Sequence, residues 1–147
     1  MKDLNPIADA KIRMADVTEL KPHPSNPRTH TKKQVGQIAK SIECFGFCNP
    51  ILIDEGNRVI AGHGRLEAAK KLGMKTVPTL VLSDLSEAEK RAYIVADNRL
   101  AELAGWDDDL LSAELSEIAA LDDGFDLELT GFDSGAIEQL IEEVLSD

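Results

Sequence analysis

The stretch GHGRLEAAKKLG, Gly62 to Gly73, directly follows the short apolar run VIA at residues 59–61. This order predicts a strand, a tight turn and an amphipathic helix. Glycines at positions 62 and 64 let backbone N–H groups approach a ligand, and the unpaired amides and the dipole of a helix start favour an anion. Arg65 adds a permanent cation whose forked donors suit phosphate. The stretch therefore indicates a phosphate-binding turn, and the alternative is a plain strand-to-helix connection.

The residues around this stretch predict short strands that alternate with helices up to residue 82. The proline-rich loop KPHPSNPRTH, residues 21–30, excludes a regular helix, and the sequence DEGN at 54–57 is typical of a hairpin turn. These patterns predict an α+β fold in which helices pack against a small mixed β-sheet. We expect strands at 11–17, 51–53, 59–61 and 79–82, and helices at about 31–44 and 62–73.

The chain beyond residue 83 has helical periodicity and many acidic residues. Ser86 and Glu89 form a capping box before a helix that reaches about Leu103. Asp107 is expected to cap a helix at 108–121, and Asp133 or Ser134 the last helix. We therefore divide the chain into an α/β core at 1–84 and an acidic helical part at 85–147.

The formal net charge of −11 is unevenly distributed along the chain. Residues 1–80 hold 13 Lys and Arg against 8 Asp and Glu, whereas residues 81–147 hold 3 against 19. The basic part suits contacts with phosphates or nucleic acid. The acidic part is expected to repel DNA. Three interpretations of it remain open: a solvated helical face, a mimic of DNA, and a surface that binds a protein partner. We expect DNA binding that is at most weak and independent of sequence.

Other features exclude several classes of protein. No apolar stretch is long enough to cross a membrane, and the start MKDLNPIADAK has no signal-peptide core, so we expect a cytoplasmic protein without membrane contact. The two cysteines, Cys44 and Cys48, cannot build a disulfide framework, and the histidines lack the spacing of zinc ligands.

Five separated motifs also occur in a fixed order. They are NPR at 26–28, SIECFGFCNPILI at 41–53, VIAGHGRLEAAKKLG at 59–73, KTVPTLVL at 75–82 and ADNRL at 96–100. This order resembles the N-terminal domain of the ParB family, in the ParB/sulfiredoxin superfamily, over about residues 11–105. The resemblance implies the same small mixed sheet with packed helices, followed here by a helical C-terminal extension.

The resemblance also implies a nucleotide site, beginning at the helix-start box. In this family the box usually has the sequence G-E-R-R and binds the triphosphate of CTP. Gly62 and Arg65 match it, whereas His63 and Gly64 replace the Glu and the first Arg. The missing Arg removes a phosphate contact worth about 1.5–3 kcal/mol, so the choice between CTP and ATP stays open. Since His63 stands where sulfiredoxins need a Cys, sulfiredoxin chemistry is not expected.

Two further segments would complete this site. Gly46 and Asn49 resemble the family's G-x-x-Q-P segment beside the base and sugar. Asn98 and Arg99 resemble the later E-N-x-Q-R box, which helps to hold magnesium and phosphates, so the first helix of the acidic part would complete the nucleotide site. Asp97 stands where Glu is usual, and Asp97 and Asn98 are the candidate magnesium ligands.

Arg28 follows a rigid Asn-Pro and is a candidate to reach the same pocket; the alternative is a role in packing its loop. We find no recognisable helix-turn-helix after the core, the part that reads DNA in a full ParB. The chain thus resembles the stand-alone ParB-like domains that occur near phage and plasmid DNA methylases.

Three functions remain open at this stage. The first is a nucleotide-binding switch in phage, plasmid or chromosome DNA metabolism, which binds CTP or ATP with magnesium and hydrolyses it slowly. The second is a ParB-like nuclease or a kinase of a small molecule such as serine, with Glu43 and Asp97 as candidate catalytic carboxylates. The third is a non-catalytic interaction module that binds a protein partner through its acidic tail. A homodimer is a candidate assembly for each.

Overall fold

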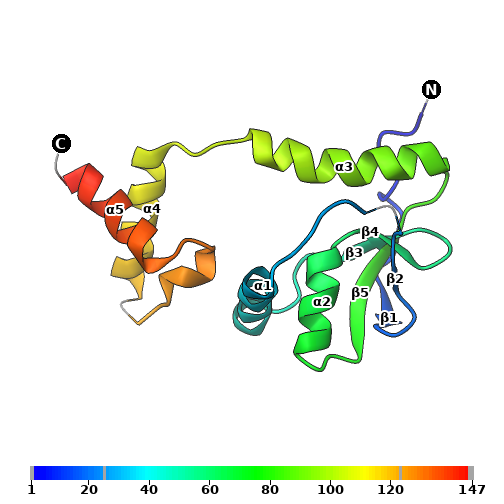
Figure 1. Ribbon diagram of the computed structural model, residues 1–147, viewed down its shortest axis with the longest axis horizontal. Coiled ribbons are helices and arrows are strands. Elements are labelled where there is room, and N and C mark those ends of the chain that lie inside the picture. The colour runs from blue at the N-terminus through cyan, green and yellow to red at the C-terminus, as the bar shows by residue number, and fades with distance from the viewer. Residues whose placement is uncertain (1, 25, 123, 146–147) are drawn as a thin grey trace. The chain divides into compact units, whose positions relative to one another are not determined.

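The computed structural model describes residues 2–24, 26–122 and 124–145. Its contacts divide the chain into two units, Met1–Glu102 and Leu103–Asp147 (Figure 1). The first unit contains the sheet and nearly all of three helices, and the second contains the remaining helices. This division lies beyond the change of composition near residue 84, because the helix that starts at Glu87 packs against the sheet through Ile94.

The five strands of the first unit form one mixed sheet, in the order β1-β5-β3-β4-β2. The pairs β1–β5 and β3–β4 are antiparallel, whereas β3–β5 and β2–β4 are parallel. The predicted α+β fold with a small mixed sheet is therefore confirmed. The strands are β1 (Arg13–Asp16), β2 (Lys21–Pro22), β3 (Ile51–Ile53), β4 (Arg58–Ala61) and β5 (Thr76–Val81).

The predicted hairpin joins β3 and β4 through the turn at 54–57. The Asp54 carboxylate accepts hydrogen bonds from the backbone N–H groups of Gly56 and Arg58, at 2.8 and 3.0 Å. Asn57 has φ +64°, a left-handed conformation that Asn tolerates better than most residues. The turn chemistry of the sequence thus fixes the loop that precedes the helix-start box.

The largest differences from the predicted strands concern β5 and β2. β5 begins at Thr76, whereas the predicted strand began at residue 79, and the observed strand includes Pro78, a residue that cannot donate a ladder hydrogen bond. The structure accommodates Pro78 since it pairs with Met14 of β1, while β3 begins its pairing at Thr79. The second difference is β2, a two-residue strand inside the proline-rich loop, with Pro22 at the edge of the sheet.

The three helices of this unit have clear sequence-encoded ends. Thr31 and Gln34 form a capping box at the start of α1 (Lys32–Phe45), and Gly46, with φ +83°, ends it. Gly62 is the N-cap of α2 (His63–Lys71). Ser86 and Glu89 exchange hydrogen bonds at the start of α3 (Glu87–Leu103), as expected for a capping box.

Hydrophobic packing covers both faces of the sheet. Val59 belongs to a core cluster with Leu66 of α2, whereas the next residue, Ile60, packs with Ile94 of α3. Neighbouring residues of a strand point to opposite faces, so α2 and α3 lie on opposite sides of β4. α1 packs beside α2 (Figure 1). The start of α2 and the middle of α3 are thereby placed at the same strand end, after Ala61.

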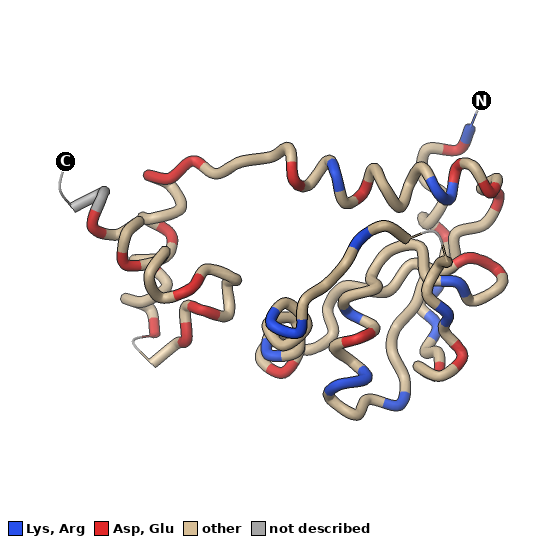
Figure 2. The backbone as a smooth tube through the Cα atoms, in the orientation of Figure 1, with Lys and Arg blue, Asp and Glu red and all other residues tan. Residues whose placement is uncertain are grey.

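The second unit contains α4 (Asp108–Leu121), the 3-10 helix η1 (Leu127–Thr130) and α5 (Ser134–Leu145). Asp107 caps α4 by accepting a hydrogen bond from the N–H of Leu110. α4 packs against α5, with Leu115 and Ile137 buried between them. From Leu103 onward the sequence has 14 Asp and Glu and no Lys or Arg, a contrast with the first unit that Figure 2 shows.

Within the described parts of the chain, no helix is both long and apolar enough to pass through a bilayer.

Candidate functional site

A cavity of about 150 Å³ lies at the N-terminus of α2, where it meets the loop before α1 and the middle of α3. Its walls therefore come from segments far apart in the sequence. The lining residues are Asn26, Arg28, His30, Ile38, Ile60, Ala61, Gly62, His63, Gly64, Arg65, Asp97 and Asn98.

Gly62 and Gly64 are required at this helix start by the space around them. Gly62 has φ +107°, and a Cβ there would lie 2.9 Å from Nη2 of Arg65 and 3.1 Å from Cγ1 of Ile51. A Cβ on Gly64 would lie 2.9 Å from Cδ1 of Ile38 and 3.1 Å from Nε2 of His30. The Arg65 guanidinium and the His30 ring thus occupy the room that the missing side chains leave.

Arg65 has fewer hydrogen bonds than its donors allow. Nη2 donates to the carbonyl oxygen of Pro50 at 3.1 Å, while Nε is buried without a hydrogen-bond partner in the described structure. Burial lowers the pKa of the guanidinium and the charge of Asp97 opposes that shift, so Arg65 stays a cation at neutral pH. A partly desolvated cation with an unused donor is suited to an anionic ligand.

His63 is held neutral by its surroundings. Burial lowers the pKa of His63 to about 4, with the charges of His23 and His30 as further causes. Its Nε2 accepts a hydrogen bond from the backbone N–H of His23 at 3.3 Å, which leaves the proton on Nδ1. His63 can therefore offer one neutral N–H to a phosphate, and it cannot replace the charge of the missing Arg.

A second cavity, of about 390 Å³, adjoins the first and shares Asn26, Arg28, His30 and His63 with it. All three histidines of the chain line this second cavity. Sequence reasoning missed His23, His30 and Asn26 as site residues. The signal that could have found them is the loop HPSNPRTH, which carries two of the three histidines beside the predicted Arg28.

The predicted α3 residues divide into two groups. Asp97 and Asn98 line the first cavity, as expected, and Nδ2 of Asn98 donates to the carbonyl oxygen of Ile94 at 2.7 Å. This bond uses one N–H of the amide, and Oδ1 is the oxygen that the side chain can offer to a ligand. Arg99 lines a separate hollow of about 180 Å³ with Arg28 and Glu102, rather than the cavity at Gly62.

Three predicted residues are not brought to this cavity. Glu43 is exposed on α1, and Gly46 and Asn49 are exposed just after that helix. None of the three is among the residues that line either cavity at the α2 N-terminus. The segment contacts the site through its next residue, because the carbonyl oxygen of Pro50 accepts the hydrogen bond from Arg65.

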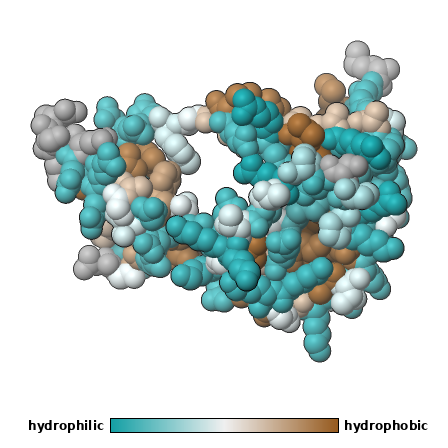
Figure 3. Space-filling view, viewed as in Figure 1, coloured by the Kyte–Doolittle hydropathy of each residue, from teal (hydrophilic) through white to brown (hydrophobic). Residues whose placement is uncertain are grey.

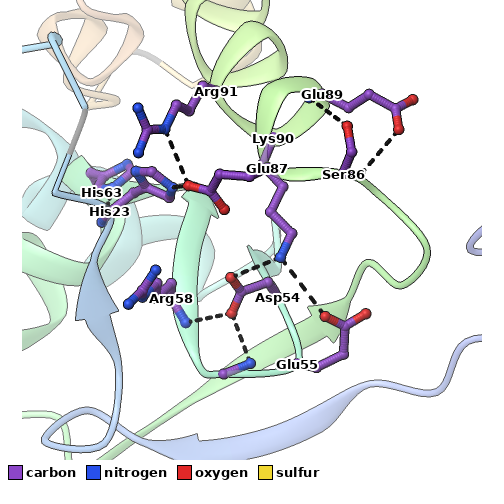
Figure 4. Close-up of polar contacts among 11 residues, drawn as sticks. His23, Asp54, Glu55, Arg58, His63, Ser86, Glu87, Glu89, Lys90 and Arg91 are labelled. Carbon is purple, nitrogen blue, oxygen red and sulfur yellow. Dashed lines mark hydrogen bonds and ion pairs between the residues drawn. The ribbon is translucent and has the colours of Figure 1, made fainter.

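The first half of α3 is fixed to the sheet by polar contacts (Figure 4). Nζ of Lys90 lies 3.3 Å from Oδ2 of Asp54, and both side chains are largely buried. Oε1 of Glu87 lies 3.3 Å from Nε2 of the buried His23. Burial raises the pKa of Asp54, and the hydrogen bonds from Arg58, Gly56 and Lys90 together lower it further than burial raises it. These contacts hold Asp97 and Asn98 over the α2 N-terminus.

The second half of α3 has fewer buried side chains. Val95 is 51% and Leu100 65% exposed, and Figure 3 shows apolar side chains on the surface of this helix. Polar contacts continue at its end, where Glu102 pairs with Arg28 and Arg99.

Among the described residues, no group of three or more His, Cys, Asp and Glu could hold a metal ion by itself. Asp97 is the one carboxylate that lines the first cavity. A magnesium ion needs few protein ligands when phosphate oxygens and water supply the others. The donors present therefore fit a metal that arrives with a phosphate ligand, and they do not fit a protein-only metal centre.

Solved structures share the architecture of this chain. The C-terminally truncated chromosome-partitioning protein ParB from Caulobacter crescentus, complexed with CTP-gamma-S, is similar with a TM-score of 0.75. The sequences are 21% identical, and the match covers 92% of this chain and 79% of that one. At this identity the likeness concerns the fold.

The expected absence of a helix-turn-helix is wrong. Residues 109–147 match the profile of the ParB-methyltransferase HTH domain, a range that contains most of α4 and all of α5. Sequence reasoning missed it because acidic charge was taken to oppose a DNA-reading helix.

The first unit has relatives of known family. Residues 1–99 match the profile of the ParB N-terminal domain. The ParB-like nuclease domain-containing protein YnaK of Escherichia coli strain K12 is 48% identical over 81 residues, 55% of this chain and 93% of that protein. Stage 0 sporulation protein J of Bacillus subtilis strain 168 is 32% identical over 96 residues, and the match covers 63% of this chain and 34% of that protein. This chain therefore belongs to the ParB N-terminal domain family.

Proposed function

We propose that this chain binds a nucleoside triphosphate at the N-terminus of α2, with CTP as the first candidate and ATP as the alternative. The observation that carries the proposal is the half-buried Arg65 guanidinium, whose Nε has no hydrogen-bond partner in the described structure. The helix-start amides at Gly62 to Gly64 add donors that favour an anion. The CTP-gamma-S named for the Caulobacter relative supports CTP as the ligand to test first.

Magnesium would bind with the phosphates in this proposal. Asp97 and Asn98 line the same cavity as Arg65, and their side chains carry a carboxylate and an amide oxygen. Both are hard oxygen ligands, and a triphosphate and water supply the remaining positions of an octahedral site. The positive ion would offset the repulsion between the Asp97 carboxylate and the phosphates of the ligand.

Hydrolysis in this site would be slow, which suits a switch. His63 is neutral, and its Nε2 already accepts a hydrogen bond from the backbone of His23. Asp97 is the remaining carboxylate candidate among the lining residues, and a metal ligand is a poor general base. The site thus offers phosphate binding without a well-placed group to activate water.

Calorimetric titration with CTP, ATP, ADP and GTP, with and without magnesium, tests this proposal. Arg65→Ala should weaken binding of the preferred nucleotide about tenfold to a hundredfold, the range for a charged hydrogen bond. Arg13→Ala is the matched control, because Arg13 lies on the edge strand β1 and its substitution removes the same charge. Equal affinities of the Arg65→Ala variant and the wild type would exclude Arg65 from the site.

A nuclease is the second candidate, favoured by the name of the Escherichia coli relative. It would use the same cavity, with Asp97 holding the catalytic metal. A two-metal nuclease needs more carboxylates than this cavity provides, so one metal would have to suffice. Incubation of plasmid DNA with magnesium or manganese separates the two candidates: a nuclease cleaves, and the Asp97→Asn variant does not.

A further inference from the structure

Glu102 uses both oxygens of its carboxylate on two arginines near the cavity. Oε1 accepts a hydrogen bond from Nη1 of Arg28, and Oε2 accepts one from Nη1 of Arg99 at 3.1 Å. Arg99 precedes Glu102 on the same helix, whereas Arg28 comes from the proline-rich loop. The contact therefore holds the loop against the last turns of α3.

Arg28 is also a wall of the phosphate cavity. It lines the cavity at Gly62 together with Asn98, and it lines the hollow that contains Glu102. Arg28 therefore lies between the proposed ligand site and the Glu102 carboxylate. The Arg28 side chain is 39% and the Glu102 side chain 42% exposed, so both can rearrange without opening the core.

Carboxylates and phosphates bind guanidinium groups in the same way. Each places two oxygens against the N–H fork, and an N–H group that donates to Glu102 is not available to a phosphate oxygen. The negative charge of Glu102 also repels a polyphosphate that approaches Arg28. Both effects weaken the binding of the ligand, and both come from the Glu102 carboxylate.

We propose that Glu102 is a built-in competitor for Arg28, so that a polyphosphate ligand binds the cavity fully when it displaces the Glu102 carboxylate. This inference rests on the proposed nucleotide site and deepens it, because it names the residue that sets the affinity. Removal of the carboxylate leaves Arg28 free to turn toward the ligand. The affinity for polyphosphates should rise as a result.

The test is calorimetry with inorganic tripolyphosphate and with CTP in the presence of magnesium, on the wild type and on Glu102→Gln. The amide keeps the size of the side chain and removes its charge. We expect binding of both probes to become roughly three- to tenfold tighter in the variant. Glu19→Gln is the matched control, since Glu19 is exposed between β1 and β2 and the change in net charge is the same. It should bind as the wild type does.

A double-mutant cycle shows whether the effect passes through Arg28. In an Arg28→Ala background, Glu102→Gln should no longer tighten binding, because the competed cation is absent. A general gain from lost negative charge would persist in that background and would overturn the inference. Melting temperatures of the four proteins would show that all are folded.

The outcomes separate this inference from the proposed function. If the wild type binds and Arg65→Ala does not, but Glu102→Gln binds as the wild type does, the nucleotide site stands and the competitor role of Glu102 falls. If Glu102→Gln alone binds tripolyphosphate, the inference is supported in its strongest form. If no protein in the set binds either probe, both proposals fail.

Discussion

Gly62 combines a backbone constraint with a steric one. Its φ of +107° is unfavourable for other residues, and a Cβ would come within 2.9 Å of the Arg65 guanidinium. Gly62→Ala should therefore lower the free energy of unfolding by about 2–4 kcal/mol, from a left-handed residue and local overpacking together. It should also weaken nucleotide binding, since Arg65 must move. Urea denaturation and calorimetry measure the two effects.

Gly73→Ala is the control for the backbone part of this prediction. Gly73 has φ +75°, but a Cβ there would meet no atom within 4 Å. The Gly73→Ala variant should lose about 1–2 kcal/mol of its free energy of unfolding, and its nucleotide affinity should not change. Equal effects of the two substitutions on both readouts would contradict the role assigned to Gly62.

His63 should titrate near its shifted pKa of about 4 in the ligand-free protein, well below the ordinary value of 6.5. Between these values the unfolded chain binds more protons than the folded chain, so stability should fall as the pH is lowered from about 6.5 toward 4. A bound triphosphate should raise the pKa of His63, because its negative charge favours the imidazolium.

NMR titration of the His63 ring protons, with and without nucleotide, checks this prediction. The His63→Gln variant should lose the part of the pH dependence of stability that His63 causes. A midpoint near 6.5 in the ligand-free protein would show that the ring is not desolvated.

At the residue scale, the helix-start box could be predicted because its chemistry is local. The glycines, Arg65 and the helix they begin are consecutive in the chain, so the local pattern was enough to predict the strand, the turn and the helix. His30 could not be found this way. Its ring reaches the cavity because the proline-rich loop lies against Gly64, a tertiary contact that the spacing of the helix-start box does not encode.

At the scale of elements, α3 is attached to the sheet by polar contacts in its first turn and by the buried side chain of Ile94. Lys90→Met keeps the apolar stem of the side chain and leaves Asp54 without its cation. Since Asp54 retains two backbone donors, we expect a loss of about 1–2 kcal/mol. The position of Asp97 should also become less fixed, with weaker nucleotide binding in calorimetry.

Lys2→Met is the control for this variant, because the Lys2–Glu89 pair is exposed. Solvent and salt screen exposed pairs, so the urea midpoint of this variant should stay close to that of the wild type. Equal losses of stability in the two variants would mean that the Asp54–Lys90 pair stabilises the fold no more than the exposed Lys2–Glu89 pair does.

The bounds of most elements followed from capping and turn residues. Thr31, Gly46 and Asp107 mark helix ends where the sequence predicted them. The prediction for β5 began too late because the effect of Pro78 depends on which neighbours the strand has. Pro78 pairs with β1 but precedes the residues that pair with β3. This depends on the arrangement of the sheet, which the proline itself does not determine.

At the scale of the whole molecule, the charge of the second unit opposes the usual partner of a helix-turn-helix. Its residues carry 14 acidic side chains and no Lys or Arg, and affinity for DNA depends on cations that neutralise phosphates. We expect weak, salt-sensitive DNA binding through the first unit. A chain that ends near residue 105 should bind DNA more tightly than the full chain.

Fluorescence anisotropy at low salt, with circular dichroism to show that the shortened chain is folded, measures this difference. A variant of the full chain with Asp108→Asn, Asp109→Asn and Glu114→Gln should have a DNA affinity between those of the full and the shortened chain. Sequence-specific binding by the full chain that is lost on shortening would show that the second unit reads DNA despite its charge.

The arrangement of the sheet has a consequence for the order in which the chain is made. β1 pairs with β5 alone, and the hydroxyl of Thr79 donates to the carbonyl oxygen of Arg13, 66 residues away. During synthesis, the β3–β4 hairpin can form early, but β1 and β3 lack the strand that joins them until residue 81 has left the ribosome. Contacts so distant in sequence form slowly. We expect β1 to be the last strand whose amides become protected, with the segment around β1 open to chaperones until β5 is available.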